Sequence, residues 1–244
     1  METRAAIGLG SNLGDRAAIL RQAVETLSAT PEIVLRQVSR NFETAPVGGP
    51  PGQGSFLNAA VTLETSLSPE RLHEVLKRIE QQAGRRRVVR WGERTLDLDL
   101  LLFGNRELDG DTLTVPHPRM SFRRFVLDPL ASIAPDWVHP TTGRTIADLR
   151  ANLDVRPLSI GLLGWDVDST ARLVTALPVF VHANPLEHLD RHAVESLQFL
   201  VAASDARESV AHSPFCKPIP TLYLDGTDVS AAREDLTAAC LSVL

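Results

Sequence analysis

The segment Thr95–Phe103 constrains this chain more than any other, because it alternates leucine with aspartate directly after a cluster of arginines. In an extended strand, residues two apart share a face. The leucines at even positions therefore line one face, and Asp97 and Asp99 line the other. The rise per residue places the two carboxylates roughly 6.6 Å apart along the strand. This spacing suits the binding of one cation by both carboxylates, or of two neighbouring cations.

The residues before this strand are rich in arginine. Guanidinium groups match phosphate oxygens in charge and geometry, and Mg²⁺ on a phosphate substrate takes one or two carboxylates. The combination indicates a site for a metal–nucleotide complex. An Asp-x-Asp strand alone also fits an ordinary amphipathic strand with a solvated acidic face, but the arginines count against that alternative. The five arginines between positions 85 and 94 are Arg85, Arg86, Arg87, Arg90 and Arg94.

Composition excludes several classes of protein. A length of 244 residues fits one large domain or two small ones. No apolar run approaches the ~18 residues of a membrane helix, and the N-terminus has no secretory pattern. Cys216 and Cys240 lack metal-ligand spacing, which fits a reducing cytoplasm. A net charge of −5 argues against general nucleic-acid binding. We therefore expect a cytoplasmic protein without a nucleic-acid or membrane partner.

Charge is distributed unevenly along the chain. Residues 155–244 hold 6 Lys and Arg against 11 Asp and Glu, which is a net charge of −5. Residues 1–154 hold 25 − 6 = 19 basic and 30 − 11 = 19 acidic residues, and are therefore neutral. Composition also shifts near residues 153–157. We expect a first domain over 1–154 and a small acidic domain over 155–244.

Strands and helices interleave in the first domain without strict βαβ alternation, which predicts an α+β fold. The expected strands cover residues 3–11, 33–43, 57–65 and 95–103. Gly8 and Gly10 are interpreted as part of a tight strand-to-helix turn, after which Asp15 caps a helix. The clearest helix starts at Ser68 as N-cap and ends at Gly84. The Gly-Pro stretch at 47–55 is expected to be irregular and mobile.

Four side chains suit a flat heteroaromatic ligand and its phosphates. Phe56 and Phe125 can stack on its two faces. The amide of Asn58 offers both a donor and an acceptor to a pterin or purine edge. His117, between prolines, can contact a phosphate or the leaving group. Each also has a plain structural alternative as a core aromatic, a turn residue or a buried histidine.

The order of several short motifs carries a family resemblance. Together they resemble 6-hydroxymethyl-7,8-dihydropterin pyrophosphokinase of the folate pathway, from about residue 5 to residue 153. The segment at 90–99 is the most specific of them. The motifs, in order, are Gly-Leu-Gly-Ser-Asn-Leu-Gly at 8–14, Thr-Ala-Pro-Val-Gly at 44–48, Phe-Leu-Asn-Ala-Ala at 56–60, Gly-Arg at 84–85, Arg-Trp-Gly at 90–92, Arg-Thr-Leu-Asp-Leu-Asp at 94–99 and Val-Pro-His-Pro-Arg at 115–119.

The resemblance implies a ferredoxin-like α+β domain that binds ATP with two Mg²⁺ ions. The family moves the β,γ-pyrophosphoryl group to the pterin hydroxymethyl oxygen and releases AMP. By position, Asp97 and Asp99 match the metal ligands, and with Arg85 and Arg94 they form the expected catalytic set. The positions around ATP are Glu80, Arg85, Arg94, Leu100, Thr114, His117 and Arg123. Those of the pterin pocket are Thr44, Val47, Phe56, Asn58 and Phe125.

Two departures from the family pattern bear on the pocket. The Gly-Pro loop at 52–55 is longer and less acidic than in many members, so its closure is expected to differ. Arg124 stands where a small residue is common, and is expected to alter the mouth of the pocket. Two rival functions stay open from the residues alone. One is a nucleotidyltransferase, which also uses Asp-x-Asp, and the other is an RNA-binding module built on residues 85–94.

Residues 155–244 carry no such match. Strands expected at 158–165, 178–183, 197–203 and 221–224, and helices at 186–196 and 231–243, predict a small α/β domain with a parallel sheet. Asp166 and Asp168 are interpreted as loop residues. Protein interaction, self-association and regulation stay open as roles for this domain. Every chemical motif precedes Leu153, so residues 1–153 are expected to fold and to act alone.

Overall fold

The computed structural model describes residues 2–84, 92–175, 177, 181–186, 197–213, 219–224 and 227–241. The chain forms two compact units. The first comprises residues 1–120, 125–140 and 145–147, and the second comprises residues 121–124, 141–144 and 148–244. The expectation of a boundary at residue 154 remains a prediction.

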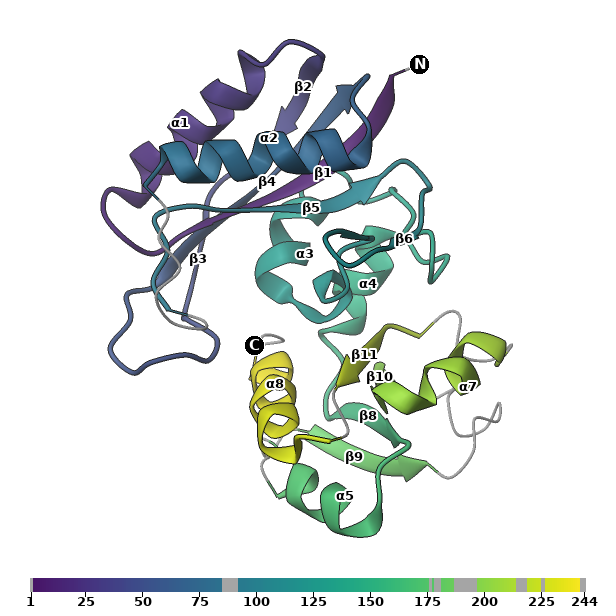
Figure 1. The fold of residues 1–244 in the computed structure, drawn as a ribbon. Coiled ribbons are helices and arrows are strands. Elements are labelled where there is room, and N and C mark those ends of the chain that lie inside the picture. The colour runs from purple at the N-terminus through teal and green to yellow at the C-terminus, as the bar shows by residue number, and fades with distance from the viewer. Residues whose placement is uncertain are drawn as a thin grey trace. The chain divides into compact units, whose positions relative to one another are not determined.

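The first unit is built on one antiparallel sheet with the strand order β2-β4-β1-β5, and β3 pairs with β4 (Figure 1). The long strands at the centre carry alternating small and branched residues, which suits a sheet covered on both faces. The strands are β1 (Thr3–Ser11), β2 (Ile33–Val38), β3 (Phe42–Thr44), β4 (Phe56–Thr65) and β5 (Asp97–Phe103). A separate hairpin pairs β6 (Leu108–Asp109) with β7 (Thr114–Val115).

Two helices, α1 (Arg16–Ser28) and α2 (Pro69–Gln82), cover one face of this sheet (Figure 1). Both begin as the sequence predicts. Asp15 accepts a hydrogen bond from the Ala18 nitrogen (3.0 Å), and Ser68 accepts one from the Arg71 nitrogen (3.3 Å). Their apolar stripes pack on one face of the strands in a single core that includes Ile7, Leu9, Leu20, Leu27, Val61, Leu63, Leu72, Leu76, Leu98 and Leu100.

The strand expected at 3–11 is confirmed as β1, and Gly8 and Gly10 lie within it rather than in the tight turn to which we also assigned them. Gly8 and Gly10 pair with β4 and with β5 over the same stretch, so they belong to the ladder. The single strand expected at 33–43 is two strands, because the chain leaves the ladder after Ser39. The Ser39 hydroxyl accepts a hydrogen bond from the Ala60 nitrogen (2.9 Å), which closes that end of β2.

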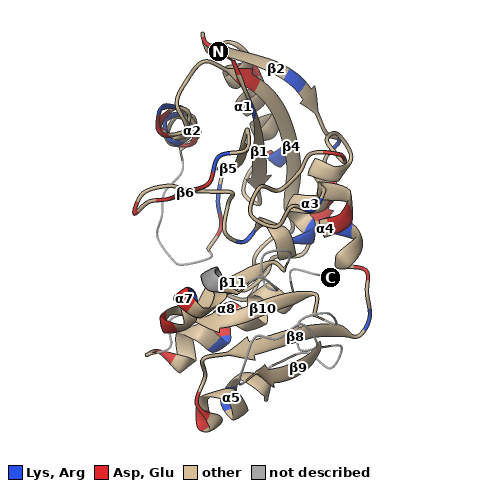
Figure 2. Cartoon of the chain, turned by 90° about the vertical axis from the view of Figure 1, so that its right-hand side faces the viewer, with Lys and Arg blue, Asp and Glu red and all other residues tan. Residues whose placement is uncertain are grey.

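Beyond β7 the first unit continues through η1 (Met120–Phe122), α3 (Arg124–Ala131) and α4 (Ile146–Asn152). The boundary between the units crosses each of these elements. From Phe125 onward, α3 lies on the side of the sheet opposite α1 and α2, as both views show (Figures 1 and 2). The sheet of the first unit is therefore covered by different elements on its two faces.

The second unit contains a four-stranded parallel sheet with the order β11-β10-β8-β9. Its strands are β8 (Leu158–Leu163), β9 (Val181–Leu186), β10 (Phe199–Ala203) and β11 (Thr221–Leu224). Its helices are α5 (Val167–Val174), the short η2 (Ser204–Ala206), α7 (Arg207–His212) and α8 (Val229–Leu241). Asp166 lies just before α5, as expected, and caps the helix by accepting from the Ser169 nitrogen (2.9 Å). Asp168, which was also expected in a loop, lies instead in the first turn of α5. Leu186, where a helix was expected to begin, is the last residue of β9, and residues 187–196 of that expected helix lie outside the described residues.

No helix in the described part of the chain is long and apolar enough to cross a membrane.

Candidate active site

The face of the sheet opposite α1 and α2 carries polar side chains of β4 and β5 on either side of a glycine in β1. Gly10 of β1 stands opposite Asn58 of β4 on one side and opposite Asp97 of β5 on the other. Gly8 stands opposite Asp99 in the same way. Neighbouring strands lie about 4.8 Å apart, so Asn58 and Asp97 are roughly 10 Å apart across Gly10. An amide that can read a ring edge and a carboxylate that can bind metal therefore share one face.

Gly10 keeps the floor between these two groups bare. A Cβ at this position would lie 3.1 Å from Asn58 Oδ1, 3.8 Å from Phe56 Cδ1 and 3.9 Å from Asp97 Cβ. The first distance is tighter than a side chain normally tolerates, whereas a Cβ at Gly8 would meet Leu101 at an ordinary 3.4 Å. Glycine is thus required at position 10 because a larger residue would crowd Asn58. The expectation of a turn did not anticipate this reason.

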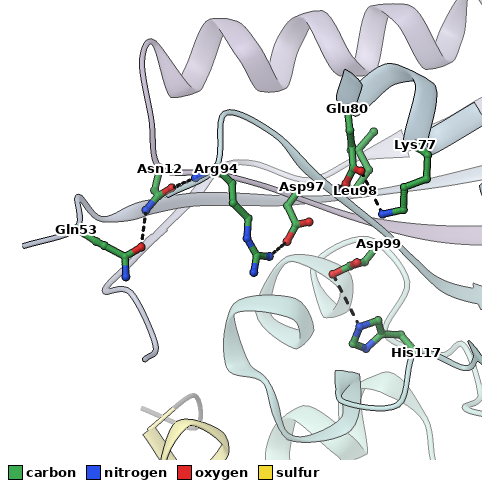
Figure 3. Close-up of polar contacts among 9 residues, drawn as sticks. All are labelled: Asn12, Gln53, Lys77, Glu80, Arg94, Asp97, Leu98, Asp99 and His117. Carbon is green, nitrogen blue, oxygen red and sulfur yellow. Dashed lines mark hydrogen bonds and ion pairs between the residues drawn. The ribbon is translucent and has the colours of Figure 1, made fainter. Parts of the chain in front are cut away.

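Asp97 and Asp99 project from the same side of β5, as the alternation predicts, and each meets a cationic or protonatable partner (Figure 3). Arg94 Nη1 donates a hydrogen bond to Asp97 Oδ2 within an ion pair. Asp99 Oδ2 lies 3.9 Å from His117 Nε2. The Asp97 side chain is 18% exposed and that of Asp99 is 36% exposed, so both remain within reach of a ligand.

The backbone fixes the orientation of the His117 ring. Its Nδ1 accepts a hydrogen bond from the Arg119 nitrogen at 3.1 Å, and an accepting nitrogen carries no proton. In the neutral ring the proton is therefore on Nε2, which faces Asp99. His117 presents a donor to the acidic side of the site, where phosphate oxygens would also accept.

Asn12 connects three segments around the site, although its sequence context predicted no role for it. Its Oδ1 accepts from the Arg94 nitrogen (2.7 Å), and its own nitrogen donates to the Arg94 carbonyl (3.1 Å). Its Nδ2 donates to the Gly54 carbonyl (3.4 Å) and to Gln53 Oε1 (3.5 Å). The side chain is buried. An asparagine directly after a strand, between Gly10 and Gly14, was the available signal.

Glu80 lies on the opposite side of β5 from the two aspartates (Figure 3). Its Oε1 accepts from the Leu98 nitrogen (2.8 Å) and its Oε2 pairs with Lys77 Nζ (3.1 Å). The residue is 2% exposed. These contacts show a carboxylate that fixes α2 to β5, and the assignment of Glu80 to ATP stays a prediction.

The expected pterin residues of β3 and β4 come together. Thr44 pairs with Phe56 in the ladder, and Asn58 Nδ2 donates to Thr44 Oγ1 (2.9 Å). This bond leaves the Asn58 oxygen and the second amide hydrogen for a ligand. Val47 lies just beyond β3, and Phe125 begins the part of α3 that belongs to the first unit.

The Gly-Pro loop is braced at its tip and at its base. Gln53 Nε2 donates to the carbonyls of Gly48 (3.2 Å) and Pro50 (3.1 Å). At the base, Arg16 Nη1 donates to Glu43 Oε1 (2.9 Å), to the Ser55 carbonyl (2.7 Å) and to Ser55 Oγ (2.9 Å). The Ser55 hydroxyl in turn donates to Glu43 Oε1, and this hydrogen bond, followed by the hydrogen bond and charge of Arg16, holds the pKa of the Glu43 carboxyl below its ordinary value. The loop has no helix or strand, as expected, and its mobility remains a prediction.

The remaining predicted residues are distributed around this centre. The Leu100 side chain is buried in the core under α1 and α2, so only its backbone is left for a nucleotide. Thr114 lies in β7. Arg123 lies in the 121–124 segment, which belongs to the second unit. Arg85 is outside the described residues.

The carboxylates of Asp97 and Asp99 fit a hard divalent cation in their chemistry. Among the described residues, no group of three or more His, Cys, Asp or Glu side chains could hold a metal. Mg²⁺ does not need such a cage, because it keeps several waters and takes further oxygens from substrate phosphates. Two carboxylates on one face therefore suffice for a site that is completed by a nucleotide.

Comparison with known proteins decides the family. The family model described as 7,8-dihydro-6-hydroxymethylpterin-pyrophosphokinase matches residues 6–135, which is more than half of the chain. The chain belongs to this pyrophosphokinase family. The match begins in β1 and ends after α3, so it contains the row of residues on β1, β4 and β5.

Curated relatives agree with this pyrophosphokinase assignment. All three described here are named 2-amino-4-hydroxy-6-hydroxymethyldihydropteridine pyrophosphokinase. The protein of Synechocystis sp. is 44% identical over 161 residues, which cover 65% of this chain and 82% of the relative. That of Bacillus subtilis is 50% identical over 133 residues, 54% of this chain and 79% of the relative. That of Methylorubrum extorquens is 46% identical over 152 residues, 62% of this chain and 94% of the relative.

Proposed function

We propose that this chain transfers the β,γ-pyrophosphoryl group of ATP to the hydroxymethyl oxygen of 6-hydroxymethyl-7,8-dihydropterin and releases AMP, as a step of folate biosynthesis. Membership of the family makes the chain an ATP-dependent pyrophosphotransferase. The observation that supports this specific reaction is the alignment of Asn58, Gly10 and Asp97 across three strands. It places an amide that can hydrogen-bond a pterin edge on the same face as a carboxylate that can bind Mg²⁺.

The pterin lies on the bare floor at Gly10 in this proposal. The Asn58 amide reads the ring edge, and its bond to Thr44 fixes the orientation of the amide. Phe56 and Phe125 supply the two stacking faces, and Val47 closes the side. Stacking and a satisfied amide give both affinity and discrimination between ring edges.

Asp97 and Asp99 hold the Mg²⁺ that accompanies ATP, and we propose two ions. Mg²⁺ held by these carboxylates would supply positive charge that offsets the charge developing on the transferring group. Arg94, which pairs with Asp97, would also offer its guanidinium to phosphate oxygens. His117 donates from Nε2 on the same side. The residues contribute position and charge, which pyrophosphoryl transfer needs more than covalent participation.

One assay tests this function against the two rivals. The protein is mixed with ATP, Mg²⁺ and 6-hydroxymethyl-7,8-dihydropterin, and the nucleotide products are separated. AMP that appears only with the pterin supports the proposal. Released pyrophosphate with a nucleotidylated acceptor would indicate a nucleotidyltransferase instead.

The RNA-binding alternative has a separate test. Salt-dependent RNA binding without any ATP turnover would favour it. The charge pattern counts against it, since acidic and basic residues are mixed along α2 (Figure 2) and residues 1–154 are neutral overall (19 basic and 19 acidic).

A further inference from the structure

Arg16 is the first residue of α1, and the proposed function gives it no role. Asp15 caps this helix, and Leu20 and Leu27 pack its inner face into the core of the first unit. The backbone of Arg16 therefore has a fixed position beside the sheet. From there its side chain reaches both ends of the Gly-Pro loop.

The guanidinium of Arg16 joins the strand that enters this loop to the residue that leaves it. Its Nη1 donates to Glu43 Oε1 in β3 (2.9 Å), and to the carbonyl (2.7 Å) and the hydroxyl (2.9 Å) of Ser55, just before β4. The Ser55 hydroxyl also donates to Glu43 Oε1. We call Arg16, Glu43 and Ser55 the neck cluster. Each of the three is hydrogen-bonded to the other two, so the cluster closes the loop at its base.

The strand at this neck has little other support. β3 has three residues, and among the described strands it pairs only with β4. Strand ends open at a low cost in free energy, and the long segment that follows at 45–55 favours opening, because closure of a flexible loop costs entropy. Thr44 is the last residue of β3, so it is the first to separate from β4 when the strand frays.

Thr44 is also the residue of β3 that supports the pterin side of the sheet. It stands opposite Phe56 in the ladder and accepts a hydrogen bond from Asn58 Nδ2 (2.9 Å). All three residues belong to the pterin pocket in our proposed function. Fraying at Thr44 would therefore release the Asn58 amide from its fixed orientation.

The neck cluster acts from the other face of the sheet. Glu43 stands opposite Leu57, and Leu57 packs against the core under α1 and α2. Directly opposed residues of an antiparallel pair share a face, so Glu43 lies on the helix side and its neighbour Thr44 on the pterin side. Arg16 thus influences the pterin only through the ends of β3 and β4.

We propose that Arg16 is a positioning residue for the pterin, because the neck cluster keeps Thr44 paired with β4 and thereby orients the Asn58 amide. This inference rests on the proposed function. The effect is expected on the pterin and not on ATP, since the cluster lies at β3 and β4 whereas the two aspartates lie on β5, at the opposite edge of the sheet. The Arg16 and Glu43 side chains are 31% and 59% exposed, so their ion pair adds little to the stability of the whole unit.

The test compares variants of the full chain in steady-state kinetics with both substrates varied. Arg16→Ala removes all three hydrogen bonds of the guanidinium, and we expect the KM for pterin to rise roughly fivefold to tenfold, the scale of one net hydrogen bond. Saturating pterin should restore the arrangement, so kcat and the KM for ATP are expected within about twofold. Arg16→Lys keeps a charged donor and should recover part of the affinity for pterin.

Arg36→Ala is the matched control. Arg36 in β2 forms a hydrogen-bonded ion pair with Glu64, which also belongs to β4 but lies at the opposite end of that strand from Phe56. The variant therefore removes an exposed Arg–Glu pair from the same sheet without touching the neck cluster. Both KM values should stay within about twofold of normal.

A double-mutant cycle tests whether the neck cluster acts as one unit. Glu43→Ala should also raise the KM for pterin, although less than Arg16→Ala, because Arg16 keeps the Ser55 carbonyl as an acceptor. The double variant Arg16→Ala/Glu43→Ala should lie within about twofold of Arg16→Ala, since the second change removes a partner that is already lost. Effects of the two changes that multiply in full would overturn the cluster.

Two direct measurements accompany the kinetics. Amide hydrogen exchange in peptides that cover residues 42–58 should be faster in Arg16→Ala than in the unaltered chain, and unchanged in Arg36→Ala. Titration calorimetry with 6-hydroxymethyl-7,8-dihydropterin, in the presence of Mg²⁺ and α,β-methylene-ATP, should show a loss of affinity that parallels the rise in KM. This analogue has a carbon bridge in place of the bond that transfer would break, so binding is measured without turnover. Thermal melting is recorded for every variant.

The outcomes separate the function from the positioning role. If the unaltered chain forms no AMP, the proposed function fails, and hydrogen exchange still shows whether Arg16 holds the neck. If it forms AMP but Arg16→Ala keeps a normal KM for pterin, the function stands and the positioning role is overturned. Equal rises in the KM for pterin and for ATP, or equal losses in Arg16→Ala and Arg36→Ala, would also overturn it, since a general disturbance of the unit would then explain the data.

Discussion

The side-chain oxygen of Asn12 accepts a hydrogen bond from the Arg94 main-chain nitrogen at 2.7 Å, and the Asn12 nitrogen donates in return to the Arg94 carbonyl. This reciprocal pair joins the end of β1 to the residue that pairs with Asp97. The other end of the Asn12 amide reaches Gly54 and Gln53 in the Gly-Pro loop. One buried side chain therefore couples the position of Arg94 to that of the loop.

Replacement of Asn12 separates these two couplings. Asn12→Ala leaves the Arg94 nitrogen without its side-chain acceptor, a loss of about 1–3 kcal/mol, and we expect kcat/KM to fall roughly tenfold or more. Asn12→Asp keeps that acceptor but cannot donate to Gly54. It should retain kcat better than the alanine variant while the KM for pterin rises. Steady-state kinetics with both substrates varied would measure this, and identical profiles for the two variants would contradict the division of roles.

Gly10 and Gly8 form a matched pair for testing the pterin floor. In Gly10→Ala the new methyl lies 3.1 Å from Asn58 Oδ1, which must move and strain its bond to Thr44. We expect the KM for pterin to rise roughly tenfold, with the KM for ATP within about twofold. In Gly8→Ala the methyl meets Leu101 at 3.4 Å, so both constants should stay near normal. Similar losses in the two variants would show that general strain in β1 is responsible.

The sequence predicted the elements whose own pattern determines them. The helix from Pro69 carries its cap, its first-turn proline and its apolar stripe within its own residues, and it starts as expected. Gly8 and Gly10 were misassigned because glycine signals a turn locally. In the fold they are strand residues selected by what lies above them on neighbouring strands, and such non-local constraints cannot be read from the segment.

The same distinction applies to the site. Asp97 and Asp99 share a face because strand periodicity requires it. The partners of these residues depend on chain segments far away in the sequence, such as Asn12 for Arg94 and His117 for Asp99.

The two aspartates should be needed for turnover but not for folding. Asp97→Asn or Asp99→Asn removes a charged metal ligand at the transferring group, and an effect above ~10²-fold on kcat is expected. Asp97→Asn also releases Arg94, so its ATP affinity should change more than that of Asp99→Asn.

Asp111→Asn, at an exposed position of the same unit, is the control. Kinetics over a range of Mg²⁺ concentrations, with circular dichroism for folding, would measure this. Near-normal turnover in either site variant would refute the metal assignment.

His139 should make the first unit sensitive to mild acid. The residue is 6% exposed, and burial lowers its pKa from 6.5 to about 4, against a smaller opposing effect of Glu107. Below pH 6.5, the His139 ring therefore binds a proton in the unfolded chain, whereas in the folded chain it stays neutral down to about pH 4. The contribution of the neutral His139 ring to the free energy of unfolding is therefore complete above pH 6.5. It is lost as the pH falls from 6.5 to about 4, by about 1.4 kcal/mol per pH unit and about 3 kcal/mol in all. Carboxyls with a lowered pKa, such as those of Glu43 and Asp154, change the free energy of unfolding only below their ordinary pKa values of 4.5 and 3.8, so their effect falls mostly at lower pH.

Urea unfolding of the protein and of His139→Gln at pH 7, 6, 5 and 4.5 would measure the difference. A variant with the same pH slope as the unaltered protein would show that His139 is not the group responsible.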